Sequence, residues 1–187
     1  MDCHTRTDGF FDITVHSENY TPSTISGIQL SSEAHTLFFQ HSGININLSG
    51  FLKGYALESI RELLQLYGIE DALVNMGNSS ILALGHHPLA TGWRIGFEQG
   101  FVSNKGEKQE VLLKNECLTV SGNDSLERKH IIAPYSGKLI EGKWMVAVVT
   151  ESGAVGEILS TAWFAADTYQ QKLLEMEFHP RLILKLC

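Results

Sequence analysis

The chain has 187 residues, of which 43% are hydrophobic and 19% are charged, a composition typical of one globular domain. Its formal net charge is −7 and it carries no long run of Lys or Arg, which excludes nucleic acid as an expected partner. The three cysteines lie far apart without a Cys-x-x-Cys pair, so neither a zinc knuckle nor a redox motif is expected.

The first third of the chain predicts short strands. After a turn signal at Asp8-Gly9, residues 10–16 are expected to form a strand or an extended segment. A hairpin is expected from residues 28–30 and 36–40. Residues 44–48 alternate apolar and polar side chains, which is typical of a half-buried strand.

A helix from Leu52 to Tyr67 is the clearest element of the sequence. Its apolar residues recur at spacings of three and four and give one apolar face, and Gly68 is a natural C-cap. A second helix is expected from Val155 to Ala166, followed by a short helical piece over residues 170–176.

The remaining elements are strands and turns. Strands are expected at residues 72–76, 81–84, 93–97, 111–113, 117–120, 144–149 and 181–186, with 111–113 paired to 117–120. Turns are expected at residues 121–124 and 133–137. Because strands outnumber helices and arrive in neighbouring runs, we expect a single α+β domain over residues 1–187, with a mixed or antiparallel sheet and helices packed on it.

Two glycine-containing stretches could bind an anion. Ser49-Gly50 and Lys53-Gly54 stand at an expected strand-to-helix junction, where helix amides and a lysine favour a phosphate. A tight turn with an exposed lysine explains this stretch equally well. Residues 75–80 could grip a phosphate through backbone amides, although a plain hairpin turn is the simpler interpretation.

Two further stretches could supply reactive groups. His130 follows the Ser121-Gly122 turn, and an imidazole there could act as a general base, although a lone histidine is more often structural. Glu157 and Thr161 are four residues apart and share a helix face, so their oxygens could hold Mg²⁺. On spacing alone, a solvated glutamate in a first helical turn is the simpler interpretation.

Taken in order, these stretches resemble the motifs of the FAD:protein FMN transferases, the ApbE family. The similar segments are residues 9–15, 47–56, 74–77, 83–85, 93–96, 121–122, 130–131 with Pro134 and Gly137, and 157–162. Each motif alone is unspecific, but their order across nearly the whole chain makes the resemblance strong.

The resemblance implies an ApbE-like fold and Mg²⁺-dependent transfer of FMN from FAD to a Ser or Thr of an acceptor flavoprotein, with release of AMP. It implies Glu157, Thr161 and the backbone carbonyl of Leu52 at the metal, and His130 as the catalytic base. The implied FAD-binding residues are Ser49, Gly50, Lys53, Asn75, Gly77, Ser79, Ser121 and Gly122.

The chain also departs from the family pattern. Asn47 and Ser49 stand where the family has Asp and Gly, Ala133 replaces an Asp near the expected base, and Glu157 replaces an Asp. These changes leave two alternatives open: a non-catalytic flavin-binding protein, and an interaction or structural protein that binds no flavin.

The chain ends carry further expectations. The chain begins where family members are well advanced, so the family's N-terminal portion is expected to be missing, and a homodimer would follow if this exposes apolar sheet surface. Family members are usually exported and membrane-anchored. The polar start of this sequence lacks a signal-peptide core, so the expected location is the cytoplasm.

Overall fold

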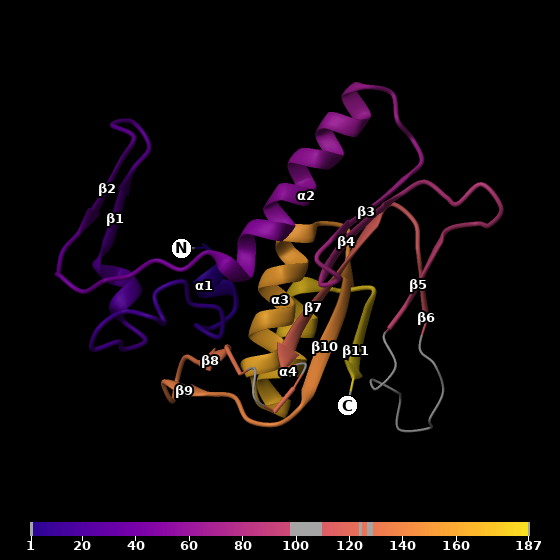
Figure 1. Cartoon of the computed structure of the whole chain (residues 1–187). Coiled ribbons are helices and arrows are strands. Elements are labelled where there is room, and N and C mark those ends of the chain that lie inside the picture. Colours follow the sequence, from indigo (N-terminus) through magenta and orange to yellow (C-terminus); the bar gives the residue numbers. More distant parts are fainter. Residues whose placement is uncertain (1, 98–109, 124, 127–128, 187) are drawn as a thin grey trace.

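The computed structural model describes residues 2–97, 110–123, 125–126 and 129–186. Its centre is a five-stranded sheet in the order β11-β10-β7-β4-β3, in which every neighbouring pair is antiparallel (Figure 1). The strands are β3 (Ala72–Met76), β4 (Ser80–Leu84), β7 (Glu116–Asn123), β10 (Trp144–Thr150) and β11 (Leu182–Leu186). The expected α+β class is therefore confirmed, with an antiparallel central sheet.

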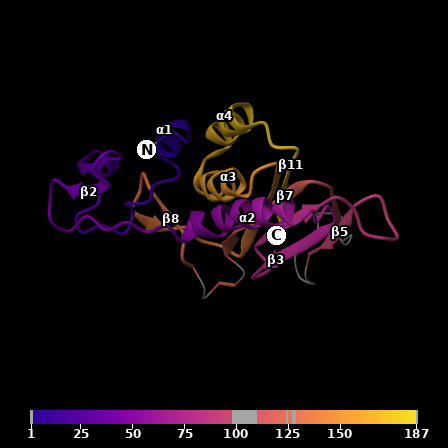
Figure 2. The same ribbon diagram turned by 90° about the horizontal axis from the view of Figure 1, so that it is seen from above.

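Two helices, α2 (Ser49–Leu66) and α3 (Gly153–Ala165), cover one face of this sheet, and α4 (Thr168–Phe178) packs on α3 (Figure 2). The apolar face of α3 includes Ile158 and Leu159, which are buried in one cluster with Val146 of β10. Burial of these side chains provides the main driving force for docking the helix on the sheet. Helix α3 therefore packs chiefly on β7 and β10.

The crossing of α2 and α3 depends on glycine. A Cβ atom added at Gly54 would lie 2.2 Å from the carbonyl oxygen of Gly153, so any side chain at this position would collide with backbone. The two helices approach closely here, which brings the first turn of α2 beside the first turns of α3.

The opposite face of the sheet is covered by a hairpin of β5 (Trp93–Gly96) and β6 (Glu110–Leu113). Val111 and Leu113 are buried in a cluster with Leu118 of β7 and Ile81 of β4. The central sheet is thus packed between helices on one face and a hairpin on the other.

The remaining elements are small. A hairpin of β1 (Ile28–Ser31) and β2 (Thr36–Phe39) confirms the expectation for this region and stands away from the central sheet (Figure 1). A short pair, β8 (Ile132–Ala133) and β9 (Lys138–Leu139), lies beyond β7. The helical pieces are α1 (Asp2–Arg6) and the 3-10 turn η1 (Thr24–Gly27).

Two expected strands near the N-terminus do not form. Residues 10–16 make turns, because the Asp12 carboxylate accepts hydrogen bonds from the backbone N–H of Thr14 at 2.7 Å and from its hydroxyl at 2.6 Å. Residues 44–48 have no strand partner, and Asn45 N–H instead donates to Ser17 Oγ at 2.9 Å. A polar side chain accepts a backbone N–H in each segment, from two positions away in the first and from 28 positions away in the second. These contacts take the place of a strand ladder for those N–H groups.

Three other expectations were wrong in detail. Strand β6 pairs with β5, not with β7, because the chain turns at Asn115 and passes from the hairpin into the central sheet. Residues 121–123 continue β7 instead of forming a turn, and Asp124 lies outside the described residues. Helix α2 begins at Ser49, so Ser49 and Gly50 form its first turn and not a preceding loop.

Candidate functional site

A cavity of about 1000 Å³ opens where the first turn of α2, the first turns of α3 and the ends of β3, β4 and β7 meet. It brings together residues from across the sequence that were expected to form a site. These are Ser49, Gly50, Lys53, Asn75, Gly77, Ser79, Ser121, Gly122, His130, Glu157 and Thr161. Leu52 is not among the lining residues; it lies within α2 with its side chain 52% exposed.

Glu157 lies on α3 at the inner end of this cavity, and it is only 3% exposed. The simpler interpretation of a solvated glutamate is therefore wrong. Gly156 explains the burial, because a Cβ atom there would lie 2.7 Å from the hydroxyls of Thr119 and Thr150. The absence of a side chain at position 156 lets α3 sit close to β7 and β10, and this carries Glu157 inward.

Two neighbours contact the same oxygen of Glu157. The Ser80 hydroxyl donates a hydrogen bond to Oε1, and Lys53 Nζ lies 3.9 Å from that oxygen. Burial raises the pKa of the Glu157 carboxyl, while the Ser80 hydrogen bond and the Lys53 charge act in the opposite direction. The site thus holds a buried acid whose ionised form is stabilised by one donor and one cation.

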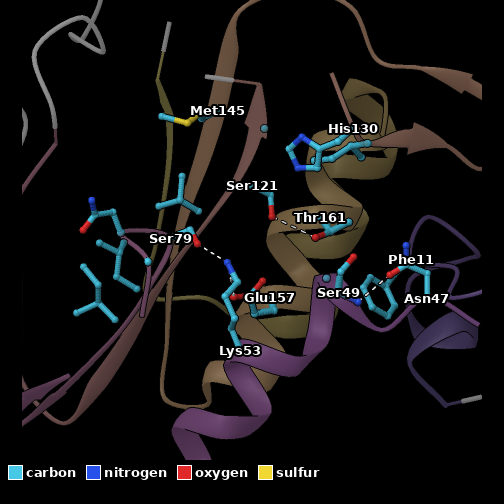
Figure 3. Close-up of a pocket in the computed structure, with 18 of the residues that line it drawn as sticks. Phe11, Asn47, Ser49, Lys53, Ser79, Ser121, His130, Met145, Glu157 and Thr161 are labelled. Carbon is cyan, nitrogen blue, oxygen red and sulfur yellow. Dashed lines mark hydrogen bonds and ion pairs between the residues drawn. The ribbon is translucent and has the colours of Figure 1, made fainter. Parts of the chain in front are cut away.

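Lys53 links the two helices to the β3–β4 turn. Its ammonium also donates to Ser79 Oγ, and Figure 3 shows its side chain between Ser79 and Glu157. This lysine is the fifth residue of α2, and Ser49 and Gly50 of the first turn also line the cavity, so a helix N-terminus and a cation face the cavity together. Both features favour a bound anion.

The β3–β4 turn is a hairpin turn that also lines the cavity. Asn75 Oδ1 accepts the backbone N–H of Asn78 at 2.9 Å, and Gly77 and Asn78 have φ values of +66° and +59°. A side chain at position 77 would meet no atom within 4 Å, so the turn is open there. Residues 75–80 therefore form a hairpin turn, and four of them also line the cavity where a phosphate could bind.

A second polar group lies on the other side of Glu157. Ser121 Oγ lies 3.1 Å from Thr161 Oγ1 and 2.8 Å from Ser160 Oγ. His130 is exposed and lines the cavity, and Figure 3 shows it on the same side as Ser121 and Thr161. Hydroxyl groups and an imidazole therefore stand within one cavity with a buried carboxylate.

The sequence reasoning missed two charged residues that line the cavity and one buried residue, Ser80, that does not line it but contacts Glu157. Ser80, which holds Glu157, was assigned only to a turn, and nothing in its local pattern marks it as different from Ser79. Asp12 and Arg94 line the cavity; both lie within the motif segments at residues 9–15 and 93–96, and those segments were the available signal.

The polar groups of the cavity fit a hard cation. Among the described residues no three His, Cys, Asp or Glu side chains gather as a metal cluster. Glu157 and Thr161 nevertheless offer a carboxylate and a hydroxyl one helical turn apart, both lining the cavity. Mg²⁺ in nucleotide sites takes one or two carboxylates and completes its shell with substrate phosphates and water, so this donor pair is suitable.

No helix within the described residues is both long and apolar enough to span a membrane.

Comparison with known proteins places the chain in a family context. Residues 18–180 match the sequence model of the ApbE family. The FAD:protein FMN transferase of Rhodobacter capsulatus is 26% identical over 174 residues, which cover 89% of this chain and 31% of that protein. The FAD:protein FMN transferase of Vibrio cholerae is 27% identical over 146 residues, covering 73% of this chain and 43% of that protein.

Solved structures show the same fold. The flavin transferase ApbE from Vibrio cholerae superposes with a TM-score of 0.79 at 20% identity and covers 98% of this chain and 67% of that chain. The ApbE protein from Thermotoga maritima superposes with a TM-score of 0.79 at 22% identity and covers 99% of this chain and 70% of that chain. The chain spans less than half the length of the two curated relatives named above.

Proposed function

The chain belongs to the ApbE family, and on that premise we propose that it transfers FMN from FAD to a Ser or Thr hydroxyl of an acceptor flavoprotein, with Mg²⁺ at the site. The observation that carries the proposal is the position of Glu157, buried within a large cavity beside Lys53 and one helical turn from Thr161. A buried acid with a cation and a hydroxyl in a cavity of this size suits the binding of a dinucleotide through its diphosphate.

In this reaction the acceptor hydroxyl oxygen attacks the phosphorus of the FMN half of FAD. The bond from that phosphorus to the bridging oxygen breaks, and AMP leaves with the bridging oxygen. His130 is the candidate base for the hydroxyl proton, since it lines the cavity and an imidazole can accept a proton near neutral pH. This chemistry requires only that the acceptor is a protein with an accessible Ser or Thr hydroxyl.

The chain's own residues would bind the diphosphate. Lys53 and the first-turn amides of α2 would neutralise part of its negative charge, and the open turn at Gly77 would let phosphate oxygens approach backbone amides. Glu157 and Thr161 would hold Mg²⁺, which when bound would supply further positive charge to the phosphates. Leu52 stays a prediction as a third, backbone ligand.

A specific observation supports the alternative of a non-catalytic flavin-binding protein. Glu157 Oε1 already has a hydrogen-bond donor in Ser80 and a cation in Lys53. Ala133, which stands where the family has an Asp, offers no carboxylate near His130. A site of this kind could bind FAD without Mg²⁺ and without turnover.

A fluorescence titration with FAD, run with and without Mg²⁺, separates these candidates. Saturable quenching that tightens with Mg²⁺ is expected from a transferase, whereas binding indifferent to Mg²⁺ would favour the non-catalytic binder. Absence of binding would favour the alternative that has no flavin ligand.

AMP release is the second measurement. The protein is incubated with FAD, Mg²⁺ and an acceptor protein that the Vibrio cholerae relative flavinylates under the same conditions, so the relative is the positive control. AMP release together with a mass increase of one FMN on the acceptor would support the proposal. No AMP release, despite tight FAD binding, would contradict it.

A homodimer stays a prediction. The carboxyl-terminal half of α2 exposes apolar side chains, including Leu63 and Leu66, and these are a candidate surface for contact between two copies.

A further inference from the structure

Ser80 is the residue that connects the central sheet to the buried carboxylate of α3. It is the first residue of β4 and is fully buried. Its hydroxyl donates to Glu157 Oε1 although the two residues are 77 positions apart. Neither the motif segments nor the expected site residues gave Ser80 a role of its own.

The surrounding contacts fix this geometry from two sides. Ser80 lies in a central strand pair, opposite Met76 of β3 and Thr119 of β7, so its backbone position is set by strands on both sides. Glu157 is set by the close approach of α3 at Gly156 to Thr119 and Thr150. A hydrogen bond between two such groups restricts how the carboxylate can rotate.

We propose that Ser80 is a positioning residue for the Mg²⁺ site: it holds Oε1 of Glu157 so that the second oxygen of the carboxylate is available to a cation in the cavity. This inference rests on the proposed function, because the Mg²⁺ ion is part of that proposal. It adds a residue that does not itself contact the metal, the nucleotide or the acceptor. Hydrogen-bond partners of metal-binding carboxylates orient the ligand, and their loss commonly lowers metal affinity by about 10- to 100-fold.

A purely structural role for Ser80 is the competing explanation, and Thr119 offers the matched control. Thr119 is also fully buried and faces Ser80 across the sheet, but its Oγ1 has no hydrogen-bond partner in the described structure. Thr119→Val removes a hydroxyl from the same buried layer and retains the side-chain shape. It leaves the contact between Ser80 and Glu157 unchanged.

The test measures binding of Mg²⁺ alone by isothermal titration calorimetry to wild-type protein, Ser80→Ala and Thr119→Val. We expect the dissociation constant for Mg²⁺ to rise by about 10- to 100-fold in Ser80→Ala and to stay unchanged in Thr119→Val. FAD affinity measured without Mg²⁺ should be the same in all three proteins. Ser80→Cys, which has a similar shape and a weak donor, should show a loss in the same direction and serves if Ser80→Ala does not fold.

Rescue by metal distinguishes positioning from a general structural fault. Raising the Mg²⁺ concentration should restore Mg²⁺-dependent FAD quenching of Ser80→Ala to the wild-type amplitude. Wild-type Mg²⁺ affinity in both Ser80 variants, or an equal loss in Thr119→Val, would overturn the proposal. Wild-type protein that binds no Mg²⁺ would overturn it together with the metal assignment, whereas Mg²⁺ binding without AMP release would count against the transferase reaction alone.

Discussion

Lys53 Nζ lies 3.9 Å from Glu157 Oε1, and this pair joins the amino-terminal part of α2 to the buried face of α3. A carboxylate removed from water is costly unless a donor or an opposite charge accompanies it. Lys53 supplies that charge, and it also contacts Ser79 in the β3–β4 turn. One side chain thus connects three of the elements that line the cavity.

Replacement of this lysine should weaken nucleotide binding. We expect Lys53→Met to lower FAD affinity by about 10-fold or more, because a charge-assisted contact to phosphate contributes about 1.5–3 kcal/mol. The measurement is a fluorescence titration in the absence of Mg²⁺. Lys53→Arg keeps the charge and is the control; equal FAD affinity in Lys53→Met and wild type would remove the lysine from the phosphate site.

The burial of Glu157 predicts a pH dependence of stability. Burial raises the pKa of this carboxyl in the folded chain, so its contribution to stability is fully present below the unfolded pKa and is lost as pH rises through the folded pKa. The window begins near the ordinary glutamate value of about 4.3. Across it, we expect the unfolding free energy of metal-free wild type to fall relative to that of Glu157→Gln.

Urea unfolding of both proteins over a pH series measures this difference. Glu157→Gln preserves size and cannot ionise, so the other titrating groups cancel in the comparison. If the unfolding free energies of the two proteins change in parallel with pH, burial does not raise the pKa of the Glu157 carboxyl.

His130 can be tested without disturbing the core, because its side chain is exposed. If it is the base, His130→Asn should reduce the rate of AMP release by about 10²- to 10⁴-fold and leave FAD affinity unchanged. His35→Asn, at an exposed position with a φ of +50° that asparagine tolerates, is the control. A His130→Asn rate equal to that of the control would assign the proton transfer elsewhere.

The helix crossing gives a prediction about stability alone. Gly54→Ala should destabilise the protein by about 1–3 kcal/mol, despite the better helix propensity of alanine, because the new Cβ would lie 2.2 Å from the Gly153 carbonyl oxygen. Gly50→Ala lies in the same helix and meets its nearest atom at 3.5 Å, so we expect it to be tolerated. Thermal unfolding followed by circular dichroism compares them, and an equally stable Gly54→Ala would show that the helices can separate at low cost.

Sequence reasoning identified most of the elements, and every expected site residue except Leu52 lines the cavity. The helix at α2 and the strand β3 were expected close to their observed bounds, because periodicity within one element is a local property. It was less successful for residues 10–16, where a strand or extended segment was expected after a turn signal, and for residues 44–48, where alternation suggested a strand. In these segments Asp12 and Ser17 accept backbone N–H groups instead. Competition from polar side chains at specific positions is not visible in a hydrophobic pattern.

The amino-acid sequence by itself determined the fold class, the family and the order of the polar stretches, because periodicity and motif order are properties of the linear sequence. Tertiary structure alone decided that Glu157 is buried and that Ser80 and Lys53 meet at one of its oxygens. The burial of a side chain and its partners depend on elements far apart in sequence. Here the close packing at Gly54 and Gly156 brings those elements together, and no local pattern encodes the resulting distances.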